Sequence, residues 1–125
     1  MNPVYKFNIP PCPKPRMTKS DRWKKRKSVL KFFEFRDTVR KWEEEMNVIL
    51  EMESFEIVFH VPMPKSWPKW KKAQMHNEPH QQRPDLDNYL KAWKDSVYEE
   101  DAVVWKVKAS KLWTDGPGHI IINFL

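Results

Sequence analysis

A long amphipathic segment between Ser28 and Leu50 constrains the fold more than any other part of this 125-residue sequence. Its apolar residues recur at alternating spacings of three and four, which is the period of one helix face. Phe33 and Leu30 widen the stripe, so we expect this helix to be buried against a sheet or a second subunit. The residues of the stripe are Phe32, Phe35, Val39, Trp42, Met46 and Ile49.

Short segments with strand character surround the long helix. Val4 to Ile9 and Phe55 to Val61 are rich in branched and aromatic residues, and both stop at prolines. Ala102 to Trp113 begins with apolar alternation and carries lysines on its other face. His119 to Leu125 follows a glycine-containing turn, so we expect it to pair with the strand before it.

Two shorter helices complete the expected order of elements. Ser66 is the expected cap of a short basic helix with Pro68 in its first turn. Apolar spacing predicts a second helix from about Asp87 to Tyr98. We therefore expect one domain, residues 1–125, of the α/β or α+β class, with a mixed sheet of about four strands, one long helix and two shorter ones.

The charge and the cysteine content limit the compartment and the partners. Lysine and arginine outnumber aspartate and glutamate by 23 to 17, and the excess is largest from Lys14 to Lys31, which suggests polyanions as partners. Cys12 is the only cysteine, so no internal disulfide forms, and no apolar run approaches a membrane span. Met1 to Pro13 lacks a signal-peptide core. We expect a cytoplasmic, nucleoid-associated protein.

Two aspartates one residue apart, Asp85 and Asp87, follow Pro84 at the expected start of a helix. Mg²⁺ prefers oxygen ligands, and one or two carboxylates with substrate phosphate oxygens make a usual site. An isolated pair of this kind is more typical of a helix start, where carboxylates satisfy exposed amides. A calcium loop is excluded, because Leu90 stands at the glycine position and Ser96 at the position of the twelfth-residue glutamate.

The basic surroundings favour the metal interpretation of the two aspartates. Carboxylates repel a phosphate backbone unless a cation intervenes. Lys91 shares a helix face with Asp87, where it either stabilises phosphate charge or forms a surface ion pair. Other basic residues are expected to follow DNA backbones, with a solvated charge run as the alternative. These residues are Lys14, Arg16, Lys19, Arg22, Lys24, Lys25, Arg26, Lys27, Lys69, Lys71 and Lys72.

The aromatic and histidine side chains near the basic segments each have two possible roles. Trp67 and Trp70 either stack on a splayed base or pack within the protein, and packing is favoured. His76 and His80 either support the acidic site or are ordinary loop residues. We expect His60 to be structural.

Four segments carry a resemblance to a known family. They are the run Lys14 to Thr18, the run Pro64 to Trp67, the block Arg83 to Ala92, and Glu100-Asp101 with the valines after them. In this order they resemble the RusA family of Holliday junction resolvases, particularly its prophage-encoded members. The block from Arg83 to Ala92 is the most specific of the four.

This resemblance implies a homodimeric endodeoxyribonuclease of a bacterial or phage-infected cell. It would use Mg²⁺ or Mn²⁺ to cut two strands of a four-way DNA junction symmetrically, in recombination and repair. The resemblance implies Asp85, Asp87 and Asp101 as metal ligands and Lys91 as the catalytic lysine, while Glu100 stands where many relatives have a second aspartate. From the residues alone, a non-catalytic DNA-binding module and a nuclease acting on flaps or forks stay open.

Overall fold

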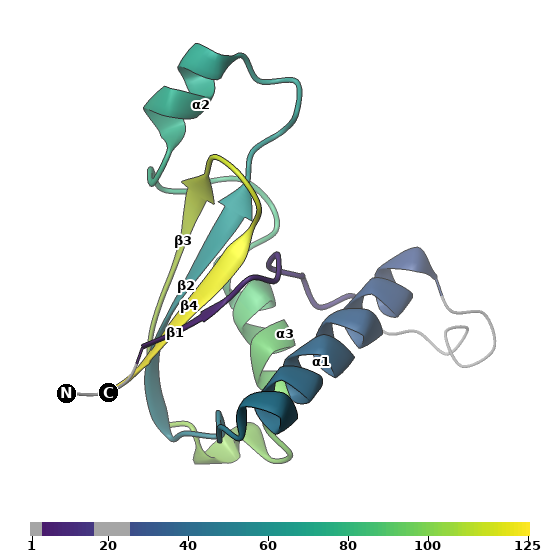
Figure 1. Cartoon of the computed structure of the whole chain (residues 1–125). Helices are drawn as coiled ribbons and strands as arrows, with labels where there is room; N and C mark the ends of the chain where they lie inside the picture. Colours follow the sequence, from purple (N-terminus) through teal and green to yellow (C-terminus); the bar gives the residue numbers. More distant parts are fainter. Residues whose placement is uncertain (1–3, 17–25) are drawn as a thin grey trace.

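The computed structural model describes residues 4–16 and 26–125. Its elements form a small α/β domain with a four-stranded mixed sheet and three α-helices, as the sequence predicts (Figure 1). The elements, in order, are β1 (Val4–Phe7), α1 (Lys27–Met46), β2 (Ser54–Pro62), α2 (Lys69–Met75), α3 (Leu86–Val97), the 3₁₀ turn η2 (Asp101–Val103), β3 (Lys106–Thr114) and β4 (His119–Phe124).

The sheet has the strand order β1-β4-β2-β3. β4 pairs antiparallel with both β1 and β2, whereas β3 runs parallel to β2. The expectation that the closing strand pairs with the strand before it is therefore wrong, because β2 separates β4 from β3. The lysine-rich β3 lies at an edge of the sheet, where lysines discourage pairing with another chain, while the apolar β4 is enclosed by two strands.

The helix α1 buries the first part of its predicted face against the sheet and α3, but the predicted burial of Leu30, Met46 and Ile49 is wrong, because all three are exposed. Val29, Phe32, Phe35 and Val39 are all buried. The helix ends earlier than the apolar stripe suggests, because Asn47 adopts the left-handed conformation with φ 52° and its N–H bonds back to the carbonyls of the last turn. Apolar periodicity alone does not predict that the helix ends at this left-handed residue.

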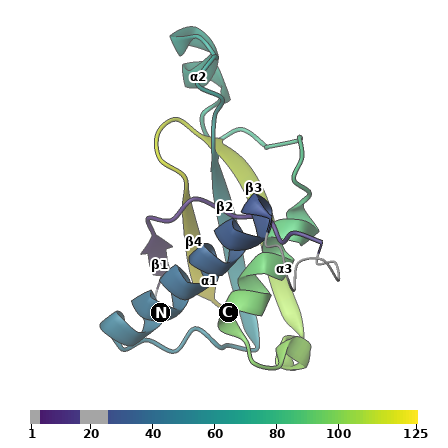
Figure 2. The ribbon, with the colours of Figure 1, turned by 90° about the vertical axis from the view of Figure 1, so that its right-hand side faces the viewer.

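The helices α1 and α3 lie side by side on one face of the sheet (Figure 2). Trp93 of α3 is fully buried and meets the Phe7 ring edge-on at 5.2 Å between centroids. Arg40 of α1 donates from Nε to the carbonyl oxygen of Ser96 at 3.1 Å. These contacts fix α3, and with it the aspartates at its start, against the rest of the domain.

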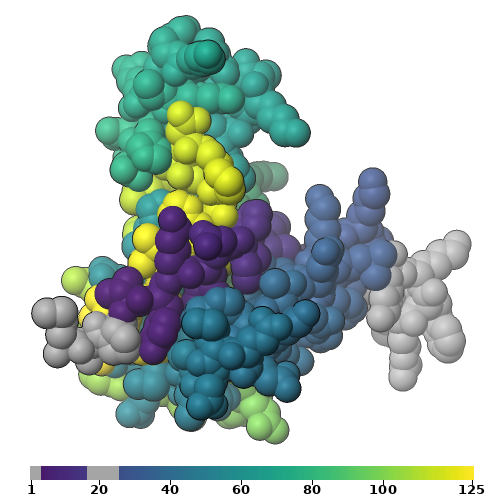
Figure 3. Space-filling model, in the orientation of Figure 1, coloured from purple at the N-terminus to yellow at the C-terminus, as the bar shows by residue number. Residues whose placement is uncertain are grey.

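The helix α2 lies beyond the end of the sheet as a protruding arm (Figures 1 and 3). It has no buried residue. Its N-cap is Pro68, which makes no side-chain cap bond, so the predicted Ser66 cap is wrong. Within residues 4–16 and 26–125, no helix is both long and apolar enough to cross a membrane.

The expected strand beginning near Val103 starts instead at Lys106. Residues Asp101–Val103 form the 3₁₀ turn η2, in which the Glu100 carboxylate accepts the N–H of Ala102 at 3.1 Å. Val103 is consequently half exposed rather than part of the sheet. The local carboxylate-to-amide bond offers the backbone an alternative to strand pairing.

Candidate active site

The aspartates Asp85 and Asp87 lie at the start of α3. Asp85 is the N-cap residue, with extended backbone (φ −66°, ψ 153°), and its carbonyl accepts the N–H of Asn88 at 3.1 Å. Its carboxylate makes no cap hydrogen bond, and both aspartates are exposed. The helix-start interpretation is thus right for the backbone of Asp85, but capping does not occupy its side chain.

A hollow of about 510 Å³ opens beside Asp85. Three separate segments line it: residues 13–16, the start of α1, and residues 83–88. Asp85 shares this hollow with Asn88 and with four basic side chains, which are Lys14, Arg16, Arg26 and Arg83. A concave surface of this charge attracts a phosphate backbone and places it against the carboxylate.

Lys14 is tied to both helices. Its Nζ lies 3.1 Å from Oδ2 of Asp95 and 4.1 Å from the centre of the Phe32 ring. The guanidinium of Arg26 donates to the carbonyl oxygen of Arg16, which joins the start of α1 to the segment of residues 13–16. The ion pair with Asp95, near the end of α3, and the contact with Phe32 hold the segment of Lys14 against both helices.

Lys91 lies one turn beyond Asp87 and is exposed. Residues four apart on a helix are neighbours on its surface, so Lys91 and Asp87 share a face, as predicted. Lys94 continues this face in the last turn of α3.

The structure places Asp101 at the other end of α3 from Asp85. Oδ2 of Asp101 lies 3.7 Å from Nζ of Lys94. Lys94 stands nine positions after Asp85, which is about 14 Å along a helix at about 1.5 Å per residue. The expected grouping of Asp85, Asp87 and Asp101 is not formed: among the described residues, no three His, Cys, Asp or Glu side chains lie close enough together to hold one metal ion.

The remaining predicted DNA contacts fall into three groups. Lys69, Lys71 and Lys72 lie on the exposed helix α2, and Nζ of Lys71 stands 4.2 Å over the Trp67 ring. Lys27 begins α1 and is exposed. The others lie outside the described residues: Lys19, Arg22, Lys24 and Lys25.

The tryptophans and histidines near the arm are mostly structural. Trp67 packs on Trp113 with ring centroids 4.8 Å apart, whereas Trp70 is 67% exposed. Nδ1 of His76 accepts the backbone N–H of Asp115 at 2.9 Å. His80 is buried against the Trp113 ring, and burial together with nearby Lys111 lowers its pKa. Of these side chains, Trp70 has the exposed ring that base stacking requires.

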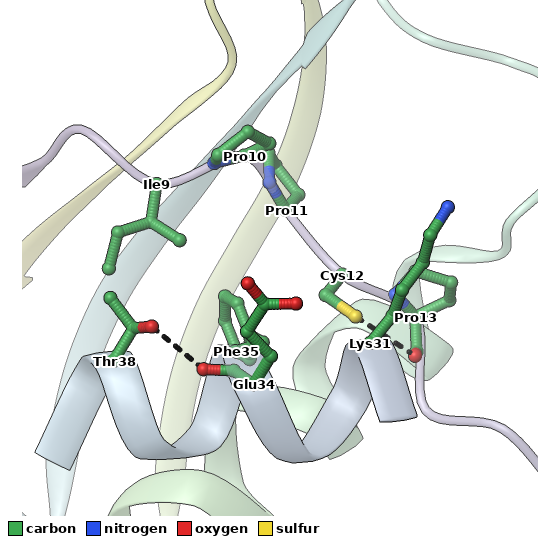
Figure 4. A pocket seen from close by; sticks show the side chains of 9 residues that line it. All are labelled: Ile9, Pro10, Pro11, Cys12, Pro13, Lys31, Glu34, Phe35 and Thr38. Carbon is green, nitrogen blue, oxygen red and sulfur yellow. Dashed lines mark hydrogen bonds between the residues drawn. The ribbon is translucent and has the colours of Figure 1, made fainter. Parts of the chain in front are cut away.

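A second hollow, of about 440 Å³, is mainly apolar and lies between the N-terminal prolines and α1 (Figure 4). Cys12 lines it, with its Sγ 3.5 Å from the carbonyl oxygen of Pro13. Burial raises the pKa of this thiol, and the charge of Lys31 only partly opposes that effect. A neutral thiol is a poor nucleophile, so this hollow does not rival the Asp85 site.

Three residues of the site were not singled out from the sequence. Arg83 and Asn88 line the hollow, and Lys111 of β3 donates to the carbonyls of Gln82 and Pro84 just before Asp85. A signal for Lys111 existed, because it stands on the same side of its strand as Val107 and Ala109. A lysine on the apolar side of a strand needs a specific partner.

The fold and this site define a class of protein: a small α/β domain in which the carboxylate of Asp85 borders a basic hollow suited to a polyanion. The family model for Endodeoxyribonuclease RusA matches residues 8–123. The chain therefore belongs to the RusA family, and it is a Holliday junction endodeoxyribonuclease, an enzyme of DNA recombination. This excludes the non-catalytic DNA-binding module. Among curated proteins, none matches the sequence.

Proposed function

We propose that this protein resolves four-way DNA junctions by paired, symmetric strand cuts that depend on Mg²⁺ or Mn²⁺. The observation that carries the proposal is the position of Asp85, whose carboxylate is not engaged in capping and borders a hollow with four basic side chains. Carboxylates bordering such a hollow would repel the phosphates that its cations attract, unless a divalent cation joins the two.

Asp85 and Asp87 fit such a cation. Both offer carboxylate oxygens, both are exposed, and one or two carboxylates per ion are usual where substrate oxygens complete the coordination. Bound there, Mg²⁺ or Mn²⁺ would neutralise the negative charge that develops on the phosphodiester during hydrolysis.

The basic residues of the chain hold the substrate. Arg16 and Arg83 present guanidinium groups at the hollow, and guanidinium can bind phosphate through two parallel hydrogen bonds. Lys91, one turn from Asp87, is the lysine proposed to bind a phosphate oxygen and stabilise its charge in the transition state. These groups position one phosphodiester over the aspartates.

Asp101 is proposed as the third acid on its resemblance to the family motif. Its carboxylate is paired with Lys94 in the structure. Joining Asp85 at one ion requires that this pair open and that residues 99–103 shift toward the start of α3. Asp101→Asn is expected to lower both Mn²⁺ affinity and cleavage if that shift occurs in the complex with DNA.

A homodimer would supply the two sites that a junction of near two-fold symmetry needs. A C2 dimer presents the same site twice without a second gene product. Size-exclusion chromatography with light scattering tests this step, and a monomer at micromolar concentration would count against paired cutting. A supercoiled plasmid with an extruded cruciform gives a second readout, because paired cuts yield linear product and unpaired cuts yield nicked circles.

The site is tested by cleavage of a labelled four-way junction in Mg²⁺. Asp85→Asn and Asp87→Asn should each reduce cleavage by about a hundredfold or more, while junction binding in EDTA persists. Asp115→Asn is the matched control, because Asp115 is an exposed aspartate outside the hollow. Full activity in both site variants would overturn the assignment. Comparing junction, fork and linear duplex at one salt concentration separates junction cutting from action on forks.

A further inference from the structure

Lys111 connects β3 to the loop that leads into Asp85. Its Nζ donates to the carbonyl oxygen of Gln82 at 2.5 Å and to that of Pro84 at 2.8 Å. The backbone joins the same two segments, because the N–H of His80 donates to the carbonyl oxygen of Lys111 at 3.0 Å. Two further backbone bonds join residues 77–78 to Trp113, so the loop is held to the edge of the sheet by main chain at three points and by the ammonium at two others, nearest to Asp85.

The bond to Pro84 acts directly on the residue that follows. The carbonyl of Pro84 and the nitrogen of Asp85 belong to one planar peptide group. Fixing that carbonyl therefore fixes the plane from which the Asp85 side chain departs. Since Asp85 makes no cap bond of its own, the ammonium of Lys111 supplies a restraint that capping does not.

The environment of Lys111 separates it from the other lysines of its strand. Lys111 is opposite Phe59 in the β2–β3 register, on the face of the sheet that the helices cover, and it is partly buried. Lys106 and Lys108 lie on the other face and are exposed. A lysine that faces two carbonyl oxygens on the inner side of a sheet is placed for the protein backbone rather than for DNA, because its ammonium carries three donors and no acceptor.

We propose that Lys111 is the positioning residue of the acidic site. By fixing the peptide before Asp85, it sets the direction of that carboxylate, so metal affinity and turnover depend on Lys111 whereas affinity for the junction does not. This inference rests on the proposed role of Asp85 as a metal ligand. Removing a residue that hydrogen-bonds to a metal ligand and orients it typically lowers metal affinity or activity by about 10- to 100-fold.

The test compares Lys111→Met, which keeps an unbranched side chain one atom shorter and removes its donors, with Lys108→Met as the matched control on the same strand. Mn²⁺ binding to the free protein is measured from the electron paramagnetic resonance signal of unbound Mn²⁺. Lys111→Met should weaken Mn²⁺ binding by about tenfold or more, and the cleavage rate at limiting Mn²⁺ should fall with it. Junction affinity in EDTA should stay within about twofold of wild type, and Lys108→Met should change none of these quantities.

Rescue separates positioning from general stability. Lys111→Arg keeps the charge and the donors and should recover part of the Mn²⁺ affinity, whereas Lys111→Gln, with a single amide group and no charge, should recover less. Urea unfolding of all variants shows whether they are folded at the assay temperature, and if Lys111→Met is not, the comparison of Lys111→Gln with Lys111→Arg carries the test.

Two results would overturn the inference. Unchanged Mn²⁺ affinity in folded Lys111→Met and Lys111→Gln would show that the loop needs no restraint from Lys111. Equal losses of junction affinity and cleavage would instead make Lys111 a DNA contact. Asp85→Asn is measured in parallel. If Asp85→Asn also keeps Mn²⁺ binding and cleavage, the proposed site itself is wrong. If Asp85→Asn loses Mn²⁺ binding and cleavage while the Lys111 variants keep them, only the role of Lys111 is rejected.

Discussion

The basic hollow beside Asp85 makes a quantitative prediction about salt. Each phosphate neutralised on duplex DNA contributes about 0.9 to the slope of log affinity against log salt concentration. Between 50 and 200 mM salt, each such contact therefore accounts for about a 3.5-fold loss of affinity. Four basic side chains line the hollow, so one phosphate contact from each would account together for a loss of about 150-fold, and contacts from three of them, with Lys14 kept in its ion pair with Asp95, for about 40-fold.

Arg83→Gln removes one of these charges while keeping a long polar side chain. We expect its salt slope to be shallower than that of wild type by about 0.9, whatever the other DNA contacts contribute to both proteins. Fluorescence anisotropy of a labelled four-way junction, titrated in EDTA at several salt concentrations, gives the slope without cleavage. EDTA also removes any divalent cation that would compete for phosphate.

Lys108→Gln is the control for Arg83→Gln, because it makes the same change in net charge at an exposed position on the opposite face of the sheet. Its slope should equal that of wild type. Equal slopes in wild type and Arg83→Gln would refute the placement of phosphates in the hollow. So would an equal decrease in the two variants, since that would reflect net charge rather than position.

Three further predictions concern stability. Trp93→Ala should lower the free energy of unfolding in urea by about 3–5 kcal/mol. Trp93→Phe should lower it by less than about 1.5 kcal/mol, because it keeps a ring against Phe7 and removes an indole N–H that has no acceptor among the described residues. Equal losses of stability in the two variants would contradict this. Gly118→Ala should lower the free energy of unfolding by about 1–3 kcal/mol in the same assay, because a Cβ there would lie 2.9 Å from Cδ of Pro62. An unchanged urea midpoint would show instead that the turn shifts enough to accommodate the added methyl group. Burial first, and then the charge of His119, lower the pKa of His60 from 6.5 to about 4. The unfolded chain therefore binds the proton more readily, so stability should fall by about 3 kcal/mol as the pH drops from 6.5 to 4, and His60→Phe should lose that part of the pH dependence; parallel curves for the two proteins would contradict the assignment.

Local patterns in the sequence predicted the elements of the fold but not all of their partners. Apolar periodicity located α1 and α3 because the period of a buried helix face is a property of the segment itself. The pairing of β4 depends on which strand encloses it, and that choice involves β1 and β2, more than fifty residues away. The turn after β3 suggested a hairpin, and the position of β2 between the two strands overrode it.

The acidic site shows the same division between local and non-local information. The spacing of Asp85, Asp87 and Lys91 fixes their positions relative to one another, because Asp85 is the N-cap of the helix that contains the other two. The place of Asp101 depends on how the chain turns after α3, and η2 leaves it beside Lys94. Lys111 reaches the site from another strand, so only its place on the apolar side of β3 marks it in the sequence.

The parallel pairing of β2 and β3 puts nearly all of the proposed chemistry in one continuous stretch of chain. The aspartates, Lys91 and the restraining Lys111 all fall between Ser54 and Thr114, whereas Lys14, Arg16 and Arg26 come from the segments before β2. Substitutions before β2 can therefore change three of the four cations of the hollow while leaving the aspartates, Lys91 and Lys111 in place. Exchanging those early segments between relatives would therefore replace most of the cations of the hollow while keeping the proposed acidic site and its supporting lysine.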